Sequence, residues 1–257
     1  MVQSEGERPL LEVERLSKAY GYLQAVDQIS FRLWPGELVA LLGENGAGKT
    51  TTLQMLAGVL TPDGGRICLR GQRLTAAELK RLVGYMPEMP ALYPGLTGQE
   101  FLEFVGGLRG FPRAFCRERA SELLVRFGLE EVARRRLRGY SQGMKRRLVL
   151  CATLLHQPPL LLLDEPLNGI DPSGVILVKR ELAALSARGH ALLIATHLLD
   201  VAERLCGRAI ILAQGRIVAD GSLDELRART GEATLEQIFA RLAQVASADV
   251  EREEERQ

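Results

Sequence analysis

A glycine-rich stretch in the first fifth of the chain has the residue types and spacing of a phosphate-binding loop. It matches the pattern G-x-x-x-x-G-K-[ST] and comprises Gly43, Glu44, Asn45, Gly46, Ala47, Gly48, Lys49, Thr50 and Thr51. Glycines without a Cβ let successive backbone N–H groups point into one concavity, where an anion can be held. Lys49 offers a positive charge to β- and γ-phosphates, and the Thr50 hydroxyl is a suitable Mg²⁺ ligand. The stretch therefore predicts a site for a nucleoside triphosphate with Mg²⁺.

The segments on either side of this loop support the same interpretation. An apolar run, Leu38–Leu42, precedes it, and Leu53, Met55 and Leu56 follow it. This order predicts a strand, a turn and a helix whose positive end adds to the anion site. An ordinary glycine-rich turn with a surface lysine is the alternative, but it does not explain why motif and flanking segments agree.

Two carboxylates follow a second apolar run. Four leucines, Leu160–Leu163, predict a strand buried on both faces of a parallel sheet, and Asp164 and Glu165 follow at its carboxyl end. Open α/β sheets bind ligands at that end of their strands. Asp164 is suited to hold Mg²⁺, and Glu165 to orient or deprotonate an attacking water. The alternative is a buried pair of structural acids.

Three further positions carry groups that could contact a nucleotide. His197 follows the predicted strand Ala191–Ala195, which places it beside the inferred phosphates. Ser141 lies at the predicted start of a helix, either as an ordinary N-cap or as a second anion-binding helix end. Tyr20 lies in a loop between two predicted strands, where it could stack on a base or simply pack the loop.

The remaining pattern predicts an α/β fold, with a mainly parallel sheet and a small antiparallel β layer. Residues 10–34 favour antiparallel strands, and short strands are predicted at 66–69, 82–86, 209–213 and 216–219. From about Thr97 to Gln157 apolar residues recur at helical spacing, which predicts a helical insertion. Helices are also expected from Ser222 to about Val245, followed by a frayed acidic tail, Asp249–Gln257.

Composition narrows the possible classes of protein. The 257 residues carry a net charge of +1 and 46% hydrophobic residues, so no global basic field favours nucleic-acid binding. Residues 1–7 show no secretory segment, and no run approaches the roughly 18–20 apolar residues that span a bilayer. The four cysteines are scattered in apolar contexts, which favours core thiols over disulfides or a zinc site.

The predicted helical insertion is basic. Between Arg109 and Arg147 there are twelve lysines and arginines against four glutamates. Such a run is usually a solvated helix face, and the alternative is a surface for anionic lipid headgroups or an acidic partner segment.

Taken together, these motifs resemble the ATP-binding subunit of ABC transporters over nearly the whole chain. Gly43–Thr51 resembles the Walker A motif, and Leu160–Glu165 resembles the Walker B motif with its catalytic glutamate. His197 resembles the switch histidine and Tyr20 the aromatic that stacks on adenine. The D-loop corresponds to Ile170-Asp171, and the signature motif to Tyr140, Ser141, Gln142, Gly143 and Met144.

The chain also departs from the family pattern. The signature usually reads Leu-Ser-Gly-Gly-Gln, and the loop before the helical insertion has Glu88 where a Mg²⁺-contacting glutamine is usual. Leu167 stands where threonine often follows Glu-Pro. This signature, the Pro-Glu loop and the short C-terminal helices are similar to a branch of prokaryotic exporter ATPases that moves drugs, lipids, polysaccharides or other small molecules.

The resemblance implies a P-loop NTPase core at about 9–86 and 158–220 and a helical subdomain at about 87–157, with C-terminal helices and an acidic tail at 221–257. It implies that two copies, or this chain and a similar one, pair head-to-tail, each ATP lying between Gly43–Thr51 of one and Ser141–Met144 of the other. It also implies a transmembrane permease partner, through which this chain would lie on the cytoplasmic side of the plasma membrane. A soluble ABC-type ATPase acting on nucleic acid or ribosomes is the alternative, and a small-molecule P-loop kinase explains neither Ser141 nor His197.

Overall fold

The strands of the protein form two separate sheets in the computed structural model, which describes residues 8–242. The larger sheet has the strand order β10-β9-β3-β8-β7-β6. Its strands from β9 to β6 are parallel, and β10 runs antiparallel to β9. Their bounds are β3 Leu38–Leu42, β6 Val83–Met86, β7 Leu160–Asp164, β8 Ala191–Ala195, β9 Arg208–Ala213 and β10 Arg216–Ser222. The predicted mainly parallel sheet is confirmed.

The centre of this sheet is apolar on both faces. Every residue of β3, β7 and β8 is buried. In β7, Leu161 and Leu163 join one hydrophobic cluster, whereas Leu160 and Leu162 join the other. This alternation is why the sequence shows an unbroken leucine run and not a polar–apolar repeat.

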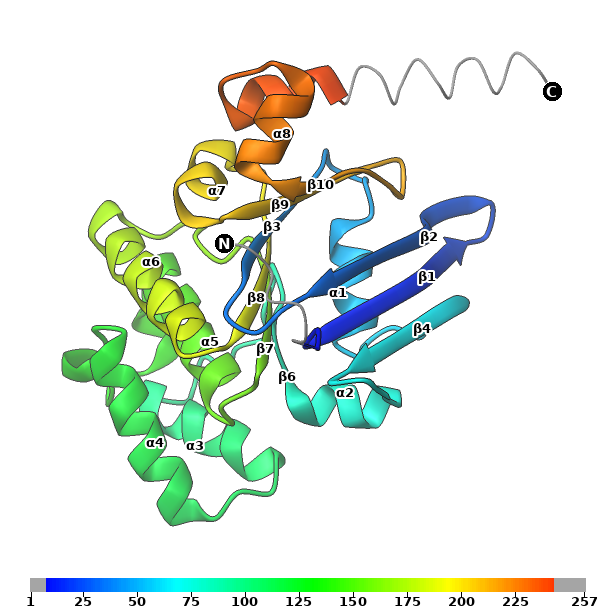
Figure 1. Cartoon of the computed structure of the whole chain (residues 1–257). Helices are drawn as coiled ribbons and strands as arrows, with labels where there is room; N and C mark the ends of the chain where they lie inside the picture. Colours follow the sequence, from blue (N-terminus) through cyan, green and yellow to red (C-terminus); the bar gives the residue numbers. More distant parts are fainter. Residues whose placement is uncertain (1–7, 243–257) are drawn as a thin grey trace.

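The smaller sheet is antiparallel and has the strand order β2-β1-β4-β5. Its strands are β1 Leu11–Tyr20, β2 Leu23–Leu33, β4 Gly64–Leu69 and β5 Gln72–Arg73. Helix α1, Lys49–Leu56, lies between the two sheets, with α2, Ala76–Leu82, beside it (Figure 1). The antiparallel layer is as predicted, whereas β5 and α2 were not predicted because their short sequences lack a clear period.

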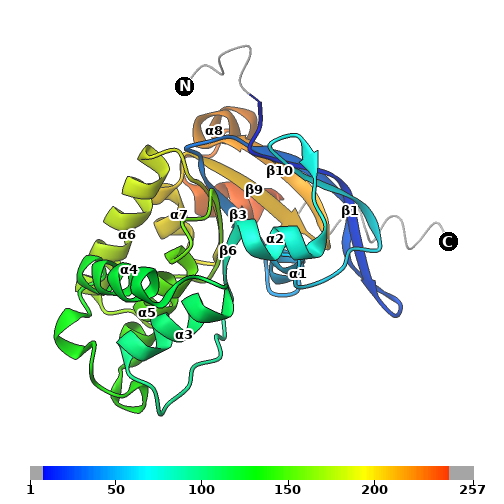
Figure 2. The ribbon, with the colours of Figure 1, turned by 90° about the horizontal axis from the view of Figure 1, so that it is seen from below.

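A group of helices covers the opposite face of the large sheet. Figures 1 and 2 show this group, which consists of α3 Gly98–Leu108, α4 Arg113–Arg126, α5 Gln142–Leu154 and α6 Pro172–Ala187. The predicted helical pattern from Thr97 to Gln157 is wrong for residues 127–139, which contain only two short 3₁₀ turns. Gly128 follows α4 with a φ of 62°, a conformation that ends a helix and that glycine adopts without strain.

The C-terminal part of the described chain packs beside the outer strands of the large sheet. It contains α7 Leu199–Leu205, α8 Leu223–Thr230 and a helix over residues 235–242. The predicted end near Val245 and the acidic tail Asp249–Gln257 lie outside the described residues. All four cysteines are free thiols, and three of them are buried. No helix within residues 8–242 combines the length and apolarity needed to cross a bilayer.

Candidate functional site

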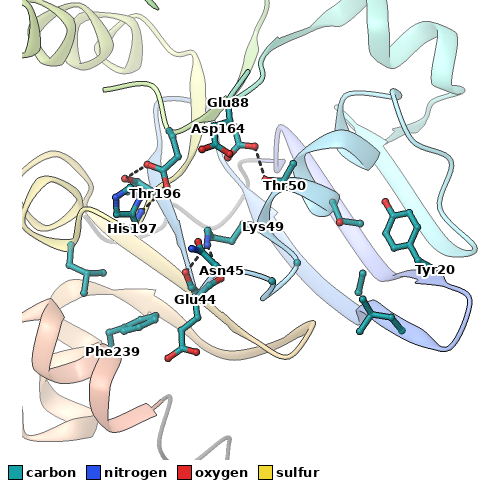
Figure 3. Close-up of a pocket in the computed structure, with 18 residues that line it drawn as sticks. Tyr20, Glu44, Asn45, Lys49, Thr50, Glu88, Asp164, Thr196, His197 and Phe239 are labelled. Atoms are coloured by element: carbon teal, nitrogen blue, oxygen red, sulfur yellow. Dashed lines mark hydrogen bonds and ion pairs between the residues drawn. The ribbon is translucent and has the colours of Figure 1, made fainter. Parts of the chain in front are cut away.

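A cavity of about 700 Å³ opens at the carboxyl ends of the parallel strands. It brings together β1, the loop after β3, the start of α1, and the residues that follow β7 and β8 (Figure 3). Thirteen of the predicted site residues line it. They are Tyr20, Gly43, Glu44, Asn45, Gly46, Gly48, Lys49, Thr50, Thr51, Glu88, Asp164, Glu165 and His197.

The backbone of the glycine-rich loop packs closely against the backbone of β2 at Gly48. Gly48 has a φ of 101°, and a Cβ placed there would lie 2.4 Å from the carbonyl oxygen of Ala25. Gly48 also caps α1 without a side-chain hydrogen bond. The N–H groups of the first turn of α1 therefore have no partner within the helix and remain available to an anion.

Lys49 reaches across this loop. Its Nζ donates hydrogen bonds to the carbonyl oxygens of Gly43 at 2.6 Å and Glu44 at 2.9 Å. Burial lowers the pKa of Lys49, while the nearby carboxylates of Glu165 and Asp164 oppose that shift. The ammonium thus lies at the cradle, where a phosphate would compete for its donors.

Thr50 and Asp164 meet across the strand ends. The Thr50 hydroxyl donates to Asp164 Oδ2 at 2.8 Å. Burial raises the pKa of Asp164, and the negative charges of Glu88 and Glu165 act in the same direction. Hydroxyl and carboxylate oxygens are ligands that Mg²⁺ prefers, and a divalent cation would relieve this crowding of negative charge. No group of three or more His, Cys, Asp or Glu side chains that could hold a metal ion occurs in the described part of the chain.

Glu165 is held by three donors from the segment after β8. Its Oε1 lies 2.7 Å from His197 Nδ1 and accepts the His197 backbone N–H at 3.0 Å, and its Oε2 accepts the Thr196 hydroxyl at 3.0 Å. Glu165 has a left-handed φ of 48°, and its N–H donates to the carbonyl of Ala195 at 2.9 Å. A non-glycine residue in this region carries strain of about 1–3 kcal/mol, which the surrounding hydrogen bonds must offset.

The other predicted binding residues lie outside this cavity. Ala47 is buried in the core under the loop. Ser141 is exposed at the N-terminus of α5, where its hydroxyl accepts the Met144 N–H at 3.2 Å. Asp171 caps α6 and accepts the Gly174 N–H at 3.0 Å.

The Ser141 turn and the Asp171 turn form one surface. A Cβ on Gly143 would lie 3.2 Å from both the Gly169 carbonyl oxygen and the Ile170 Cα. A Cβ at this distance would be tighter than most real contacts, so glycine at 143 lets the start of α5 pack closely on residues 169–171. This surface is separate from the residues that line the chain's own cavity.

Several lining residues were not predicted from the sequence. Thr196 directly follows the buried strand β8 and precedes His197. This position at a strand end could have identified it as a site residue. Leu23, Ala25 and Leu199 also line the cavity, as does Phe239 from the C-terminal helix. Nothing in the sequence pointed to Phe239, because its spacing along the chain does not reveal which cavity the residue lines.

The comparisons with known proteins agree with this geometry. Residues 26–168 match the family described as ABC transporter. The chain is 45% identical over 221 residues to an uncharacterized ABC transporter ATP-binding protein, YxlF of Bacillus subtilis, covering 85% of this chain and 72% of the relative. It is 41% identical over 214 residues to the Nod factor export ATP-binding protein I of Paraburkholderia xenovorans, covering 82% and 70% of the two chains.

A solved structure matches as well. An ATP-binding subunit of an ABC transporter superposes with a TM-score of 0.83 at 35% identity, over 91% of this chain and 99% of the other. The fold and the relatives agree with the site. One cavity of a size that suits a nucleotide contains both the glycine-rich anion cradle and the neighbouring carboxylates Asp164 and Glu165. The chain belongs to the ABC transporter family, as one of its ATP-binding and ATP-hydrolysing subunits.

Proposed function

We propose that this subunit drives export through a transmembrane permease, by ATP-dependent closure of two ATPase subunits. The observation that carries the proposal is the separation of two half-sites. Ser141 is exposed and does not line its own chain's cavity. Its turn packs instead against Gly169–Asp171. A head-to-tail pair would place the turn Ser141, Gln142, Gly143 and Met144, with Asp171 beside it, over a second copy's cavity.

Within each cavity we assign roles from geometry and charge. Lys49 and the N–H groups of Gly43–Thr51 bind the phosphates, and the ring of Tyr20 stacks on the base. Thr50 and Asp164 hold Mg²⁺, with Glu88 nearby, and the ion when bound neutralises charge on the β- and γ-phosphates. Glu165 orients and deprotonates the attacking water, and His197 contacts the γ-phosphate while holding the Glu165 carboxylate.

A second concavity is the proposed contact with the permease. It has a volume of about 680 Å³ and lies between the loop at residues 88–94 and the residues Leu137, Arg138, Lys145 and Arg146, and Gln142 is the one residue of the signature turn that lines it. Met89 and Tyr93 are exposed, at 89% and 53%. Exposed apolar side chains beside a groove are typical of a protein–protein contact. Through this contact the subunit would lie at the cytoplasmic face of the plasma membrane.

Export is inferred from the relatives. One relative is named for Nod factor export, and a linearmycin resistance ATP-binding protein of Bacillus subtilis is 38% identical over 231 residues. An ATPase acting on nucleic acid or ribosomes is not favoured, because the net charge is only +1.

Mixing two inactive subunits tests the pairing. Lys49→Ala removes the phosphate contact, and Ser141→Arg blocks the signature turn. A mixed dimer keeps one intact site, built from Lys49 of one copy and Ser141 of the other. Each variant alone should hydrolyse little ATP, and an equal mixture should recover up to about a quarter of the wild-type rate, because half of the dimers are mixed and each of these has one of two sites intact. A mixture as inactive as its components would contradict the shared site.

A further inference from the structure

The lining of the nucleotide cavity contains two separate apolar regions. One consists of Tyr20, Leu23 and Ala25 from β1 and β2, which suits the base of a nucleotide. The other consists of Leu199 and Phe239. Figure 3 shows Phe239 across the cavity from Tyr20, on the side of Glu44. The proposed nucleotide pose uses the first region and leaves the second without a role.

Phe239 reaches the cavity because its helix is anchored firmly. Leu235 and Ile238 on the same helix are each 1% exposed and belong to the core that also contains Leu223 and Leu226 of α8. The position of the next residue, Phe239, is therefore determined by tertiary packing. Its side chain is only partly buried and borders the cavity.

Polar contacts hold the same helix at its start. The Thr234 hydroxyl accepts the Gln237 N–H at 3.3 Å, while the Gln237 side chain accepts the Thr234 N–H at 3.3 Å. Arg227 of α8 donates from Nε to the Ala233 carbonyl at 3.0 Å, and Arg241 donates to the Thr230 carbonyl. This network joins the helix to α8 on both sides of the connecting turn.

We propose that Phe239 is a positioning residue for ATP hydrolysis, and that the C-terminal helix supplies it as an apolar wall of the cavity that Glu165 and His197 also line. The inference rests on the proposed function. An apolar wall excludes bulk water, which strengthens the electrostatic interactions of Glu165 and limits the positions open to the attacking water. The expected consequence is a change in turnover more than in nucleotide affinity.

The test compares variants of the full-length chain in steady-state ATP hydrolysis. Phe239→Ala should lower kcat about tenfold, equivalent to about 1.4 kcal/mol in the activation free energy, and leave KM nearly unchanged. Phe239→Tyr keeps the ring and should restore kcat. Leu242→Ala is the matched control, because Leu242 lies on the same helix, is partly buried against the same core and does not line the cavity.

Thermal unfolding separates positioning from packing. Both alanine variants should lose similar stability, but only Phe239→Ala should lose turnover. If Phe239→Ala keeps the wild-type kcat, or if Leu242→Ala loses as much, the inference is overturned while the proposed function stands. A wild-type chain that hydrolyses no ATP overturns both.

Discussion

The side chains of Glu165 and His197 are in direct contact, with Glu165 Oε1 2.7 Å from His197 Nδ1. The two residues end up together because β7 and β8 pair in parallel register, with Asp164 opposite Ala195. Each strand then delivers its next residues to the same edge of the sheet. A carboxylate that accepts from a ring nitrogen and two other donors has a fixed orientation, as a base that must face one water requires.

The first prediction concerns the proposed base. Glu165→Gln should slow ATP hydrolysis by about 10²–10⁴, the range that positioned acid–base groups contribute. ATP binding should persist, because the amide leaves the phosphate loop intact, so an ATP-bound dimer should accumulate. Turnover assays and gel filtration with ATP measure the two effects. Unchanged turnover would eliminate the role assigned to Glu165.

Thr196 should affect ATP turnover indirectly, by orienting the Glu165 carboxylate. Thr196→Val removes the hydroxyl that donates to Glu165 Oε2 at 3.0 Å and keeps the shape of the side chain. A hydrogen bond to a charged group contributes about 1.5–3 kcal/mol, so we expect kcat to fall by about tenfold or more.

The matched control is Thr153→Val, another buried threonine, whose hydroxyl donates to the Val149 carbonyl within α5. It should leave kcat unchanged. In the Glu165→Gln background, Thr196→Val should add little, because the two changes act on one group. Full additivity would show that Thr196 acts elsewhere.

Lys49 is predicted to govern nucleotide affinity. Lys49→Ala should weaken ATP binding by roughly 10- to 100-fold, which is what about 1.5–3 kcal/mol of charged hydrogen bonding provides. Equilibrium titration with a fluorescent ATP analogue measures the dissociation constant of each protein. Lys80→Ala, at an exposed position on α2, is the control and should bind as the wild type does. Equal affinities for the three proteins would refute the phosphate-loop assignment.

Asp164 should destabilise the nucleotide-free protein as pH rises. Burial and the neighbouring carboxylates raise its pKa in the folded state above the ordinary 3.8, so the unfolded chain releases this proton at lower pH. The folded state therefore loses stability from about pH 4 upward, until Asp164 is ionised in both states. The Asp164→Asn substitution removes this pH-dependent loss of stability, because asparagine does not ionise. The asparagine side-chain oxygen can still accept the Thr50 hydrogen bond.

Thermal unfolding at two pH values checks this prediction. At pH 8 without nucleotide the Asp164→Asn variant should melt roughly 2–4 °C higher than the wild type, the shift that about 1 kcal/mol produces in a chain of this size. At pH 4–5 the difference should shrink. Adding ATP with Mg²⁺ should stabilise the wild type more than the variant. A variant that melts lower than the wild type at pH 8 would contradict the argument.

Local chemistry explains why much of the site could be predicted. The phosphate loop was predictable because positive φ angles at Gly46 and Gly48, and the backbone approach at Gly48, demand glycine at fixed positions. The strand Leu160–Asp164 was predictable because a run buried on both faces must be continuously apolar. The prediction for residues 127–139 failed because apolar spacing does not reveal where 3₁₀ turns replace a helix.

The sequence by itself determined the family, the fold class and the residues placed at the ends of strands, because these depend on backbone conformation and burial within short segments. The tertiary structure alone decided that Thr196 supports Glu165, that Gly143 packs on residues 169–171, and that Phe239 enters the cavity. Each of these contacts joins segments that are distant along the chain. Such contacts depend on strand register and helix packing, which no local pattern of residues specifies.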